Sequence, residues 1–558
     1  MRRPARVVPF VCAAIAVAAC GGGESALDAG LDDEPAQTES RTEAGQDESI
    51  ASDDGAAVAD EGDGDADAGD GDGGADAGDG SASGESDVAG DAAGQAADGD
   101  EASTDGLSEP APSPLEGLPP CPVDALDTVG DGPIELTMWF GLADQLAGEL
   151  QALTDAFNAS QDQVVVELEN QTDYETTIDN YLNLSEANRP DLVMVPEFVV
   201  QTFAESDSFV PIEACVEAAG LDTSTFLDRT LVAYSYGGVQ WGMPFNVSSP
   251  VLYFNKQVFE AAGLDPDDPP QSFDEMRAAA EAIVASGAAT FGEVVDVSRD
   301  GAGARIEQWL GQLESPFVDG GNGRAARATE ARFGGADGLA LFTYLRDMRR
   351  DELIVSVGEN AGGLDAFLKL IDPSEPGAMT VATSAGIVQV IQALGGGIAE
   401  GLTEDDIGVG FLPGPDGDVA AQVGGASLWI PAGRGDAETA AAWSYIDFLV
   451  SARSQSTWAA NTGYVPMRSD ALDLDPIATL FADDPRFRVS YDQLAAPVGS
   501  IEAARPALGP QREVRQVLAD VIATIYRDPS LDDDALAALV ADAVEQADAL
   551  IATYNRLN

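Results

Sequence analysis

The side chains best suited to chemistry in this sequence are short polar residues at the ends of predicted strands. Asn246, Ser248 and Ser249 stand between two strand-like runs, and Thr383 and Ser384 end a third run just before a helical pattern. Hydroxyls donate and accept hydrogen bonds, and the start of a helix adds backbone N–H groups that favour an anion. Ser384 would also serve as the N-cap of that helix, a role compatible with ligand contact. The pattern favours binding of a small polar molecule.

The chain contains no histidine. This removes Ser-His-Asp and Cys-His nucleophile systems, HExxH zinc sites and imidazole metal ligands. The four cysteines form no CxxC motif, which disfavours a metal site built on thiolates. Hydrolysis by a pair of carboxylates remains open. We therefore expect no cofactor, no metal and no enzymatic activity.

The elements that must position these polar groups alternate between strand and helix. Strands are predicted at 134–140, 163–168 and 191–195, with helices at 142–157 and 174–187 between them. Such alternation predicts an α/β fold in which helices cover a parallel sheet. In open sheets of this kind ligands bind beyond the carboxyl ends of the strands. Residues 139–142, Tyr174 and residues 196–198 are candidate ligand contacts for that reason.

The stretch from 240 to 275, QWGMPFNVSSPVLYFNKQVFEAAGLDPDDPPQSFDE, organises the rest of the chain. Its first half predicts two strands. A short helix should then run from Lys256 to Ala262 and end at Gly263, and Ser272 with Glu275 forms a capping box for the next helix.

The pattern GxPFNxSxPVLYFNKxxFExAGLDPxxPPxSFDE resembles the hinge signature of the family 1 extracellular solute-binding proteins of ABC importers, above all the glycerol-3-phosphate-binding (Ugp-type) branch. A second run, GGASLWI…AAWSYIDFLVS…TWAANTGYVPMRSDA, resembles the same family, and the resemblance covers about 133–558. It implies a bilobed periplasmic-binding-protein fold of α/β class, in which two βα lobes are joined by hinge crossings and close on a ligand. Lobe 1 is expected at about 121–245 and 384–450, including a strand at 407–412, and lobe 2 at about 246–383 and 451–558.

The resemblance also implies a ligand-binding set. Relatives use tyrosine, carboxylate, serine hydroxyls, a glycine amide and an arginine in a Pro-Gln-x-Arg motif, whereas Arg512 directly follows Gln511 here, with Arg505 as the alternative arginine. The other matching positions are Tyr174, Glu197, Ser248, Ser384, Gly425 and Tyr464. Relatives carry tryptophans where residues 300–305 read DGAGAR. This loss is expected to widen the site toward a bulkier glycerophosphodiester or a sugar.

The N-terminus has the pattern of a targeting segment. Arginines at 2, 3 and 6 precede an apolar run at 7–19 that is too short for a transmembrane helix. The sequence VAACG resembles a bacterial lipobox, so residues 1–19 are expected to be a lipoprotein signal peptide and Cys20 the lipidated residue; the alternative is a plain secretory signal. An exported context favours a disulfide between Cys121 and Cys215.

Residues 20–120 are expected to form an acidic, disordered tether. From residue 24 this segment holds 29 acidic residues and only Arg41 as a base, and it has little apolar surface to bury. Its Asp-Gly repeats do not have EF-hand spacing, which argues against calcium binding. From residue 121 onward the net charge is about −46, which disfavours nucleic acid or anionic membranes as partners.

We therefore expect a monomeric substrate-binding protein, lipid-anchored outside the cytoplasm, that delivers a glycerol-3-phosphate or glycerophosphodiester-type solute to an ABC permease. Three alternatives remain open: a sugar or oligosaccharide binder, an anchored hydrolase that uses two carboxylates, and an adhesin displayed on an acidic stalk.

Overall fold

The computed structural model describes residues 113–128, 130, 132–358, 364–497 and 499–558. The expected signal peptide, the Cys20 anchor and nearly all of the acidic tether lie outside these residues. Of the helices that the structure describes, none is long and apolar enough to cross a membrane.

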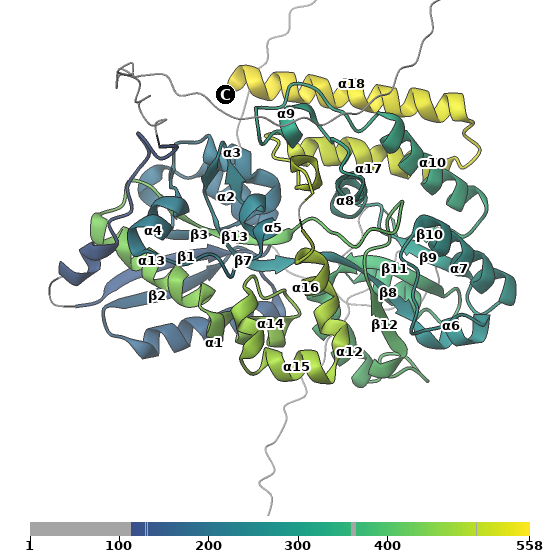
Figure 1. The fold of residues 1–558 in the computed structure, drawn as a ribbon, viewed down its shortest axis with the longest axis horizontal. Helices are drawn as coiled ribbons and strands as arrows, with labels where there is room; N and C mark the ends of the chain where they lie inside the picture. Colours follow the sequence, from purple (N-terminus) through teal and green to yellow (C-terminus); the bar gives the residue numbers. More distant parts are fainter. Residues whose placement is uncertain (1–112, 129, 131, 359–363, 498) are drawn as a thin grey trace, which may run out of the picture. The chain divides into compact units, whose positions relative to one another are not determined.

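The first lobe is built on a sheet of six strands (Figure 1). Its path runs β2-β1-β3-β13-β4, with β7 also paired to β13, and the strands are β1 (Ile134–Phe140), β2 (Val164–Asn170), β3 (Leu192–Pro196), β4 (Phe209–Val210), β7 (Met243–Ser248) and β13 (Gly424–Pro431). The pairs β1–β2 and β1–β3 are parallel, whereas β13 runs antiparallel to its neighbours. A two-stranded ribbon, β5 (Ser235–Tyr236) and β6 (Val239–Gln240), stands apart from this sheet.

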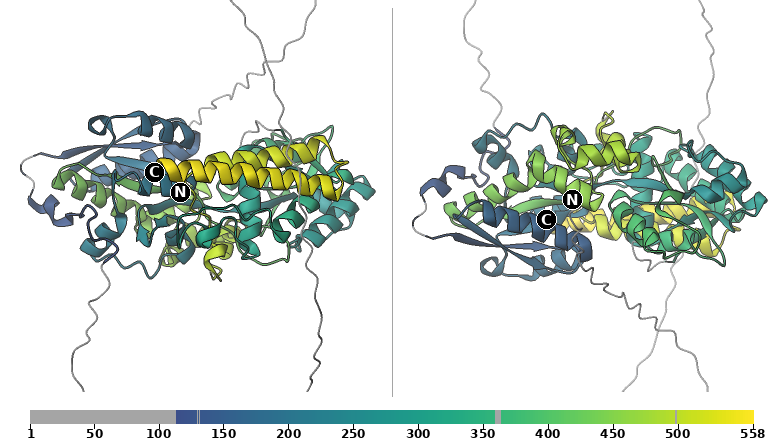
Figure 2. Two further views of the ribbon diagram at one scale, coloured as in Figure 1. Left: turned by 90° about the horizontal axis from the view of Figure 1, so that it is seen from above. Right: turned by 90° about the horizontal axis from the view of Figure 1, so that it is seen from below.

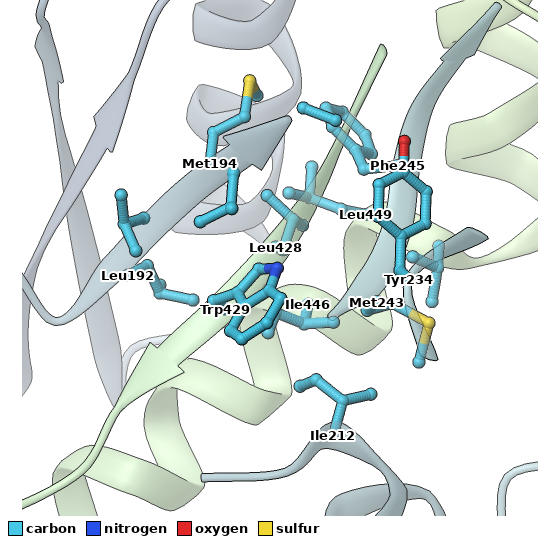
Figure 3. Packing of buried hydrophobic residues seen from close by; sticks show 14 of the residues in the cluster. Leu192, Met194, Ile212, Tyr234, Met243, Phe245, Leu428, Trp429, Ile446 and Leu449 are labelled. Atoms are coloured by element: carbon cyan, nitrogen blue, oxygen red, sulfur yellow. The ribbon is translucent and has the colours of Figure 1, made fainter. Parts of the chain in front are cut away.

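Helices complete the first lobe and enclose its core. They are α1 (Asp144–Ser160), α2 (Tyr174–Asn183), α3 (Val200–Ala204), α4 (Ile212–Ala219), α5 (Asp228–Ala233), α13 (Asp436–Val450), α14 (Ala452–Thr462) and α15 (Ile477–Asp483). Trp429 of β13 is fully buried and packs edge-on against Phe209, with ring centroids 4.9 Å apart. Figure 3 shows Trp429 among the labelled buried residues of this core, which also include Leu428 and Ile446.

The second lobe is built on a five-stranded sheet of order β10-β9-β11-β8-β12. Its strands are β8 (Pro250–Asn255), β9 (Phe291–Val295), β10 (Ile354–Ser356), β11 (Gly377–Thr383) and β12 (Ile407–Gly410). Its helices are α6 (Lys256–Ala262), α7 (Phe273–Ser286), α8 (Ala304–Gln312), α9 (Asp319–Asn322), α10 (Ala336–Arg350), α11 (Asp365–Leu370), α12 (Ile387–Gly395), α17 (Gln511–Arg527) and α18 (Asp533–Leu557). Figure 2 shows the two C-terminal helices side by side.

Ser249 is the hinge residue between the two sheets, because β7 ends at Ser248 and β8 begins at Pro250. Its hydroxyl lies 2.6 Å from that of Ser490 in α16 (Val489–Leu494), and its carbonyl accepts from the Ser384 amide at 2.9 Å. The Gln493 side chain also donates to the Ser249 hydroxyl. Three separate segments of the chain therefore meet at one buried serine.

The expected α/β class and bilobed architecture are confirmed, and so are the local signals around the hinge. Asn255 caps α6, Gly263 ends that helix with a φ of 79°, and the capping box of Ser272 and Glu275 opens α7. These features depend only on neighbouring residues, which is why the sequence alone predicts them.

The lobe assignment of four segments differs from the expectation. Helix α12, expected in the first lobe, packs on β8 of the second, and α15, expected in the second lobe, packs on α14 of the first. The strand expected at 407–412 in the first lobe is β12, which pairs antiparallel with β8 of the second sheet. The chain returns to the first sheet only at Gly424. Helix α14, placed in the second lobe from the sequence, packs against α1 and α13 of the first lobe. Strand and helix periodicity predict element type but carry no information about which sheet an element joins.

Cys121 and Cys215 form a disulfide with a sequence separation of 94 residues. Cys215 lies in α4, and both residues are buried in the first-lobe core. The bond joins the entry segment of the domain to the first lobe.

Candidate ligand-binding site

Tyr174 begins α2 at the junction of the two lobes, where Asp173 caps the helix by accepting from the Thr176 amide at 2.7 Å. The Asn246 side chain in β7 donates to the Tyr174 hydroxyl at 2.5 Å. Tyr464 follows the end of α14 and stacks on Trp458, with centroids 5.6 Å apart and 17° between the planes. The Tyr464 hydroxyl is close enough to Tyr174 to affect its pKa. The junction is thus lined by the aromatic rings of Tyr174 and Tyr464, each of which carries a hydroxyl group.

These phenols are uncharged at neutral pH. Burial raises the pKa of Tyr174 well above 10, and the nearby Tyr464 adds to this shift. Burial likewise raises the pKa of Tyr464, and of Tyr234 at the end of α5, and the Glu197 carboxylate raises both further. All three can therefore donate as well as accept hydrogen bonds.

Glu197, at the carboxyl end of β3, faces arginines of the second lobe. The Arg505 guanidinium donates to its carboxylate at 2.6 Å, and an Arg515 nitrogen lies 3.4 Å from the same oxygen. Arg515 also donates through two nitrogens to both oxygens of Glu307, each at 2.8 Å. All four side chains are buried. They form a central charge cluster of two arginines and two carboxylates that spans both lobes.

The arginines also set the ionisation state of Glu307. Burial alone would raise the pKa of this carboxyl, but the charges and hydrogen bonds of Arg515 and the charge of Arg505 outweigh it. The net result is a pKa below the ordinary value of 4.5. Glu307 is therefore a carboxylate at neutral pH.

Three buried polar atoms at this junction have no hydrogen-bond partner among the residues that the structure describes. They are the hydroxyl of Tyr234, Oδ1 of Asn246 and Nε of Arg505. Each residue is more than nine-tenths buried. Because leaving such groups unpaired costs about 1–3 kcal/mol each, donors and acceptors of this kind suit a polar ligand.

The serines and the glycine of the expected set lie beside the hinge. Ser248 is buried at the end of β7, and Gly425 pairs with Val247 in the adjacent strand. Gly425 has a φ of 96°, and a Cβ there would lie 2.0 Å from the Asn246 carbonyl oxygen, so only glycine fits. Ser384 differs from its expected capping role, since Thr383 accepts from the Ala385 amide, whereas the Ser384 hydroxyl accepts from the Ser249 amide at 3.4 Å.

The glycine-rich segment at 300–305 is closely packed. It forms the turn η4 (Arg299–Gly303) and the start of α8, and a Cβ at Gly303 would lie 2.7 Å from Cβ of Arg515. Glycine thus lets this turn approach α17 where relatives were expected to carry a bulky aromatic residue. The turn also places Arg299 against Glu175 of α2, at 2.7 Å.

Comparison with known proteins identifies the family. The model of the bacterial extracellular solute-binding proteins matches residues 152–488. The chain belongs to this family. The sn-glycerol-3-phosphate-binding periplasmic protein UgpB of Escherichia coli strain 536 is 24% identical over 419 residues, which cover 72% of this chain and 90% of that protein.

Solved structures of this family share the fold. UgpB from Mycobacterium tuberculosis in complex with glycerophosphocholine is 20% identical with a TM-score of 0.58, covering 76% of this chain and 100% of that one. The sugar-binding protein MalE of Xanthomonas citri is 17% identical with a TM-score of 0.61, covering 76% of this chain and 99% of that one.

In this solute-binding protein, one residue of the expected set lies apart from the others. Arg512 is on the rim, where it pairs with Glu175 and, at 3.2 Å, with Asp179 of α2. The sequence-based assignment also missed Arg515, Glu307 and Tyr234, and it named Asn246 as a polar candidate without placing it in the ligand-binding set. For Arg515 a signal existed, because this arginine falls within the buried stripe of α17.

Proposed function

We propose that this member of the solute-binding protein family captures a glycerol-3-phosphate or glycerophosphodiester-type solute and delivers it to an ABC permease. The observation that carries the proposal is the central charge cluster. It presents two buried arginines from the second lobe opposite a carboxylate of the first, beside unpaired hydroxyl and amide groups.

The charge balance around the cluster favours an anionic ligand. Arg324 of the second lobe donates to the carbonyls of Arg505, Val232 and Ser235 at 2.5–2.8 Å and pairs with no carboxylate among the described residues. Burial, together with the positive charge of Arg505, lowers the pKa of Arg324 to about 9, so it is still a cation at pH 7. Three arginines, of which Arg324 contacts the backbone of Arg505, therefore stand against the two carboxylates of Glu197 and Glu307, and a phosphate would neutralise the excess positive charge.

The polarity of the junction gives the ligand an orientation. Arginine donors suit phosphate oxygens, and charge-assisted bonds of this type are stronger than neutral ones. We infer that the phosphate contacts Arg505 and Arg515, while the glycerol hydroxyls donate to Glu197 and exchange hydrogen bonds with Tyr174 and Tyr464. Hinge opening would separate Glu197 from both arginines and admit the solute.

Calorimetry on wild type and on Arg505→Gln and Arg515→Gln tests the proposal. The solutes are glycerol-3-phosphate, glycerophosphocholine and maltose, and Arg277→Gln, whose arginine pairs with Asp351 and Glu281 within the second lobe, is the control. Loss of one charge-assisted bond worth about 1.5–3 kcal/mol should weaken phosphate-ester binding about ten- to a hundred-fold. The control should bind like wild type. Wild type that ignores both phosphate esters would refute the proposal.

A neutral sugar is the second candidate, favoured by one observation. Tyr464 stacks on Trp458 and, with Tyr174, offers an amphipathic aromatic surface of the kind that carries both a flat face and a polar tip. Tight binding of maltose, unaffected by Arg515→Gln, would favour this candidate over a phosphate ester.

We further propose that Cys20 carries a lipid that anchors the chain outside the cytoplasm, and that residues 20–120 act as the tether. The sequence VAACG at the end of an apolar run supports the anchor. We expect the protein to act as a monomer, without a cofactor, a metal or enzymatic turnover.

A further inference from the structure

The rim of the junction has ion pairs that connect the lobes without belonging to the central charge cluster. Glu175 of α2 pairs with Arg299 of η4 at 2.7 Å and with Arg512 of α17. Arg512 also reaches Asp179, one turn further along α2, at 3.2 Å. One first-lobe helix is thus contacted by two separate elements of the second lobe.

We propose that Glu175, Arg299 and Arg512 form an interlobe clasp that positions Tyr174 in the closed state and slows ligand release. These three are positioning residues, because they act through α2 and not by touching the ligand. The proposal rests on the proposed function in one respect, which is that it takes Tyr174 as a ligand-binding residue.

Chain connectivity couples the clasp to the site. Glu175 directly follows Tyr174 in the first turn of α2, so an arginine that fixes Glu175 also fixes the start of that helix. The Tyr174 hydroxyl in turn meets Asn246 of β7. Separation of the lobes would break the Arg299 and Arg512 contacts and free the N-terminal turn of α2 at the same time.

The clasp has the same polarity as the other contacts between the lobes. The carboxylates of Glu175, Glu197 and Glu205 come from the first lobe, whereas their arginine partners come from the second. Opposite charges therefore face each other when the lobes close. The chain has only 27 basic residues and 98 acidic ones. Because basic residues are scarce, the arginines of the second lobe that face the first lobe are a notable concentration of positive charge.

The clasp residues are partly exposed, with 25–28% of each side chain accessible. Exposed ion pairs are weak, each worth about 0.2–1 kcal/mol. Each pair should therefore change a rate by only about 1.4- to fivefold. Replacing Glu175 or Arg512, which each take part in two of these pairs, should have a larger effect than replacing Arg299.

The first measurement needs no ligand. Amide hydrogen exchange in the α2 peptide is compared between the full-length protein and its Glu175→Gln, Arg299→Gln and Arg512→Gln variants. We expect faster exchange in Glu175→Gln and Arg512→Gln than in Arg299→Gln, and near wild-type exchange in Arg299→Lys, which keeps the charge. Arg277→Gln, with its pairs inside the second lobe, should leave α2 unchanged. Unchanged α2 exchange in Glu175→Gln would overturn the clasp.

The second measurement follows the release of glycerophosphocholine by stopped-flow tryptophan fluorescence. Glu175→Gln, which removes two pairs, should raise the dissociation rate about two- to 25-fold. It should leave the association rate within about twofold, and the effect should disappear at high salt, where exposed charges are screened. Equal changes in the two rates would refute a role in holding the closed state. Failure of the wild type to bind this probe would count against the proposed function, while the exchange result would still decide the clasp.

Discussion

Replacing Glu307 with glutamine is expected to destabilise the second lobe by about 3 kcal/mol, at the lower end of the cost of breaking a buried ion pair. Glu307 is fully buried and accepts from Arg515 through both oxygens at 2.8 Å and from Gln511 at 3.0 Å. Glutamine keeps the shape, but its amide nitrogen would face an Arg515 donor. The second carboxylate near Arg515, Glu197 at 3.4 Å, compensates only in part.

Urea unfolding of the ligand-free protein, followed by far-ultraviolet circular dichroism, measures this loss. The matched control is Glu281→Gln, which removes a carboxylate of the same lobe whose side chain is 55% exposed and pairs with Arg277. An exposed pair contributes about 0–1 kcal/mol, so the control should unfold close to wild type. If both variants lose the same amount, or if Glu307→Gln loses less than about 1 kcal/mol, the reasoning from burial fails.

The pH dependence supplies an independent check of sign. The arginines hold the pKa of Glu307 below its ordinary value of 4.5. A carboxyl whose pKa is lowered on folding contributes stability that is complete above the unfolded pKa and is lost as pH falls through the folded value. The difference in unfolding free energy between wild type and Glu307→Gln should therefore be constant near neutral pH and shrink below pH 4.5. A difference that grows on acidification would contradict the assignment.

Two further predictions concern the cysteines. The double variant Cys121→Ser with Cys215→Ser opens a loop of 94 residues, and the chain-entropy model predicts that its free energy of unfolding falls by about 4.6 kcal/mol. Urea unfolding of the variant and of the oxidised wild type measures this difference, and a difference under about 1 kcal/mol would show that the bond does not constrain the unfolded chain. Cys20→Ala should move the protein from the membrane fraction to the soluble fraction of cells, because a lipidated cysteine is the attachment we propose; a variant that still sediments with membranes would rule out this anchor.

The parts of the fold that the sequence predicts are those in which local chemistry determines the outcome. The capping box at Ser272 and the left-handed Gly263 involve residues no more than four apart. The contact between Glu197 and Arg505, in contrast, joins residues 308 positions apart. No periodicity encodes such a pair, so the sequence identifies both residues without showing that they meet.

The same limit explains the lobe of β12. Its four residues, Ile407–Gly410, form a short apolar run that fits either sheet, and pairing with β8 decides its place. The family resemblance covers this segment but does not state the pairing of its strands. Which sheet a strand joins is a tertiary property, and it can be assigned only when the hydrogen-bond partners of that strand are known.

Arg512 and Arg515, two of the three arginines of α17, differ in helical phase, and this difference is present in the sequence. The buried residues of α17 are 511, 514, 515, 518, 519, 521, 522, 523 and 525, and most of them lie on one helical face. Arg515 lies in this stripe and is 3% exposed, so it needs buried carboxylates as partners, and it contacts Glu307 and Glu197. Arg512 lies about 100° around the helix from Gln511 and stays 25% exposed on the rim. Helical phase therefore favours Arg515, in the middle of the buried stripe, as a candidate for ligand contact. Arg512 lies at the edge of the stripe, near the phase of the buried Ala519, and its ion-pair partners in α2 decide that it stays on the rim.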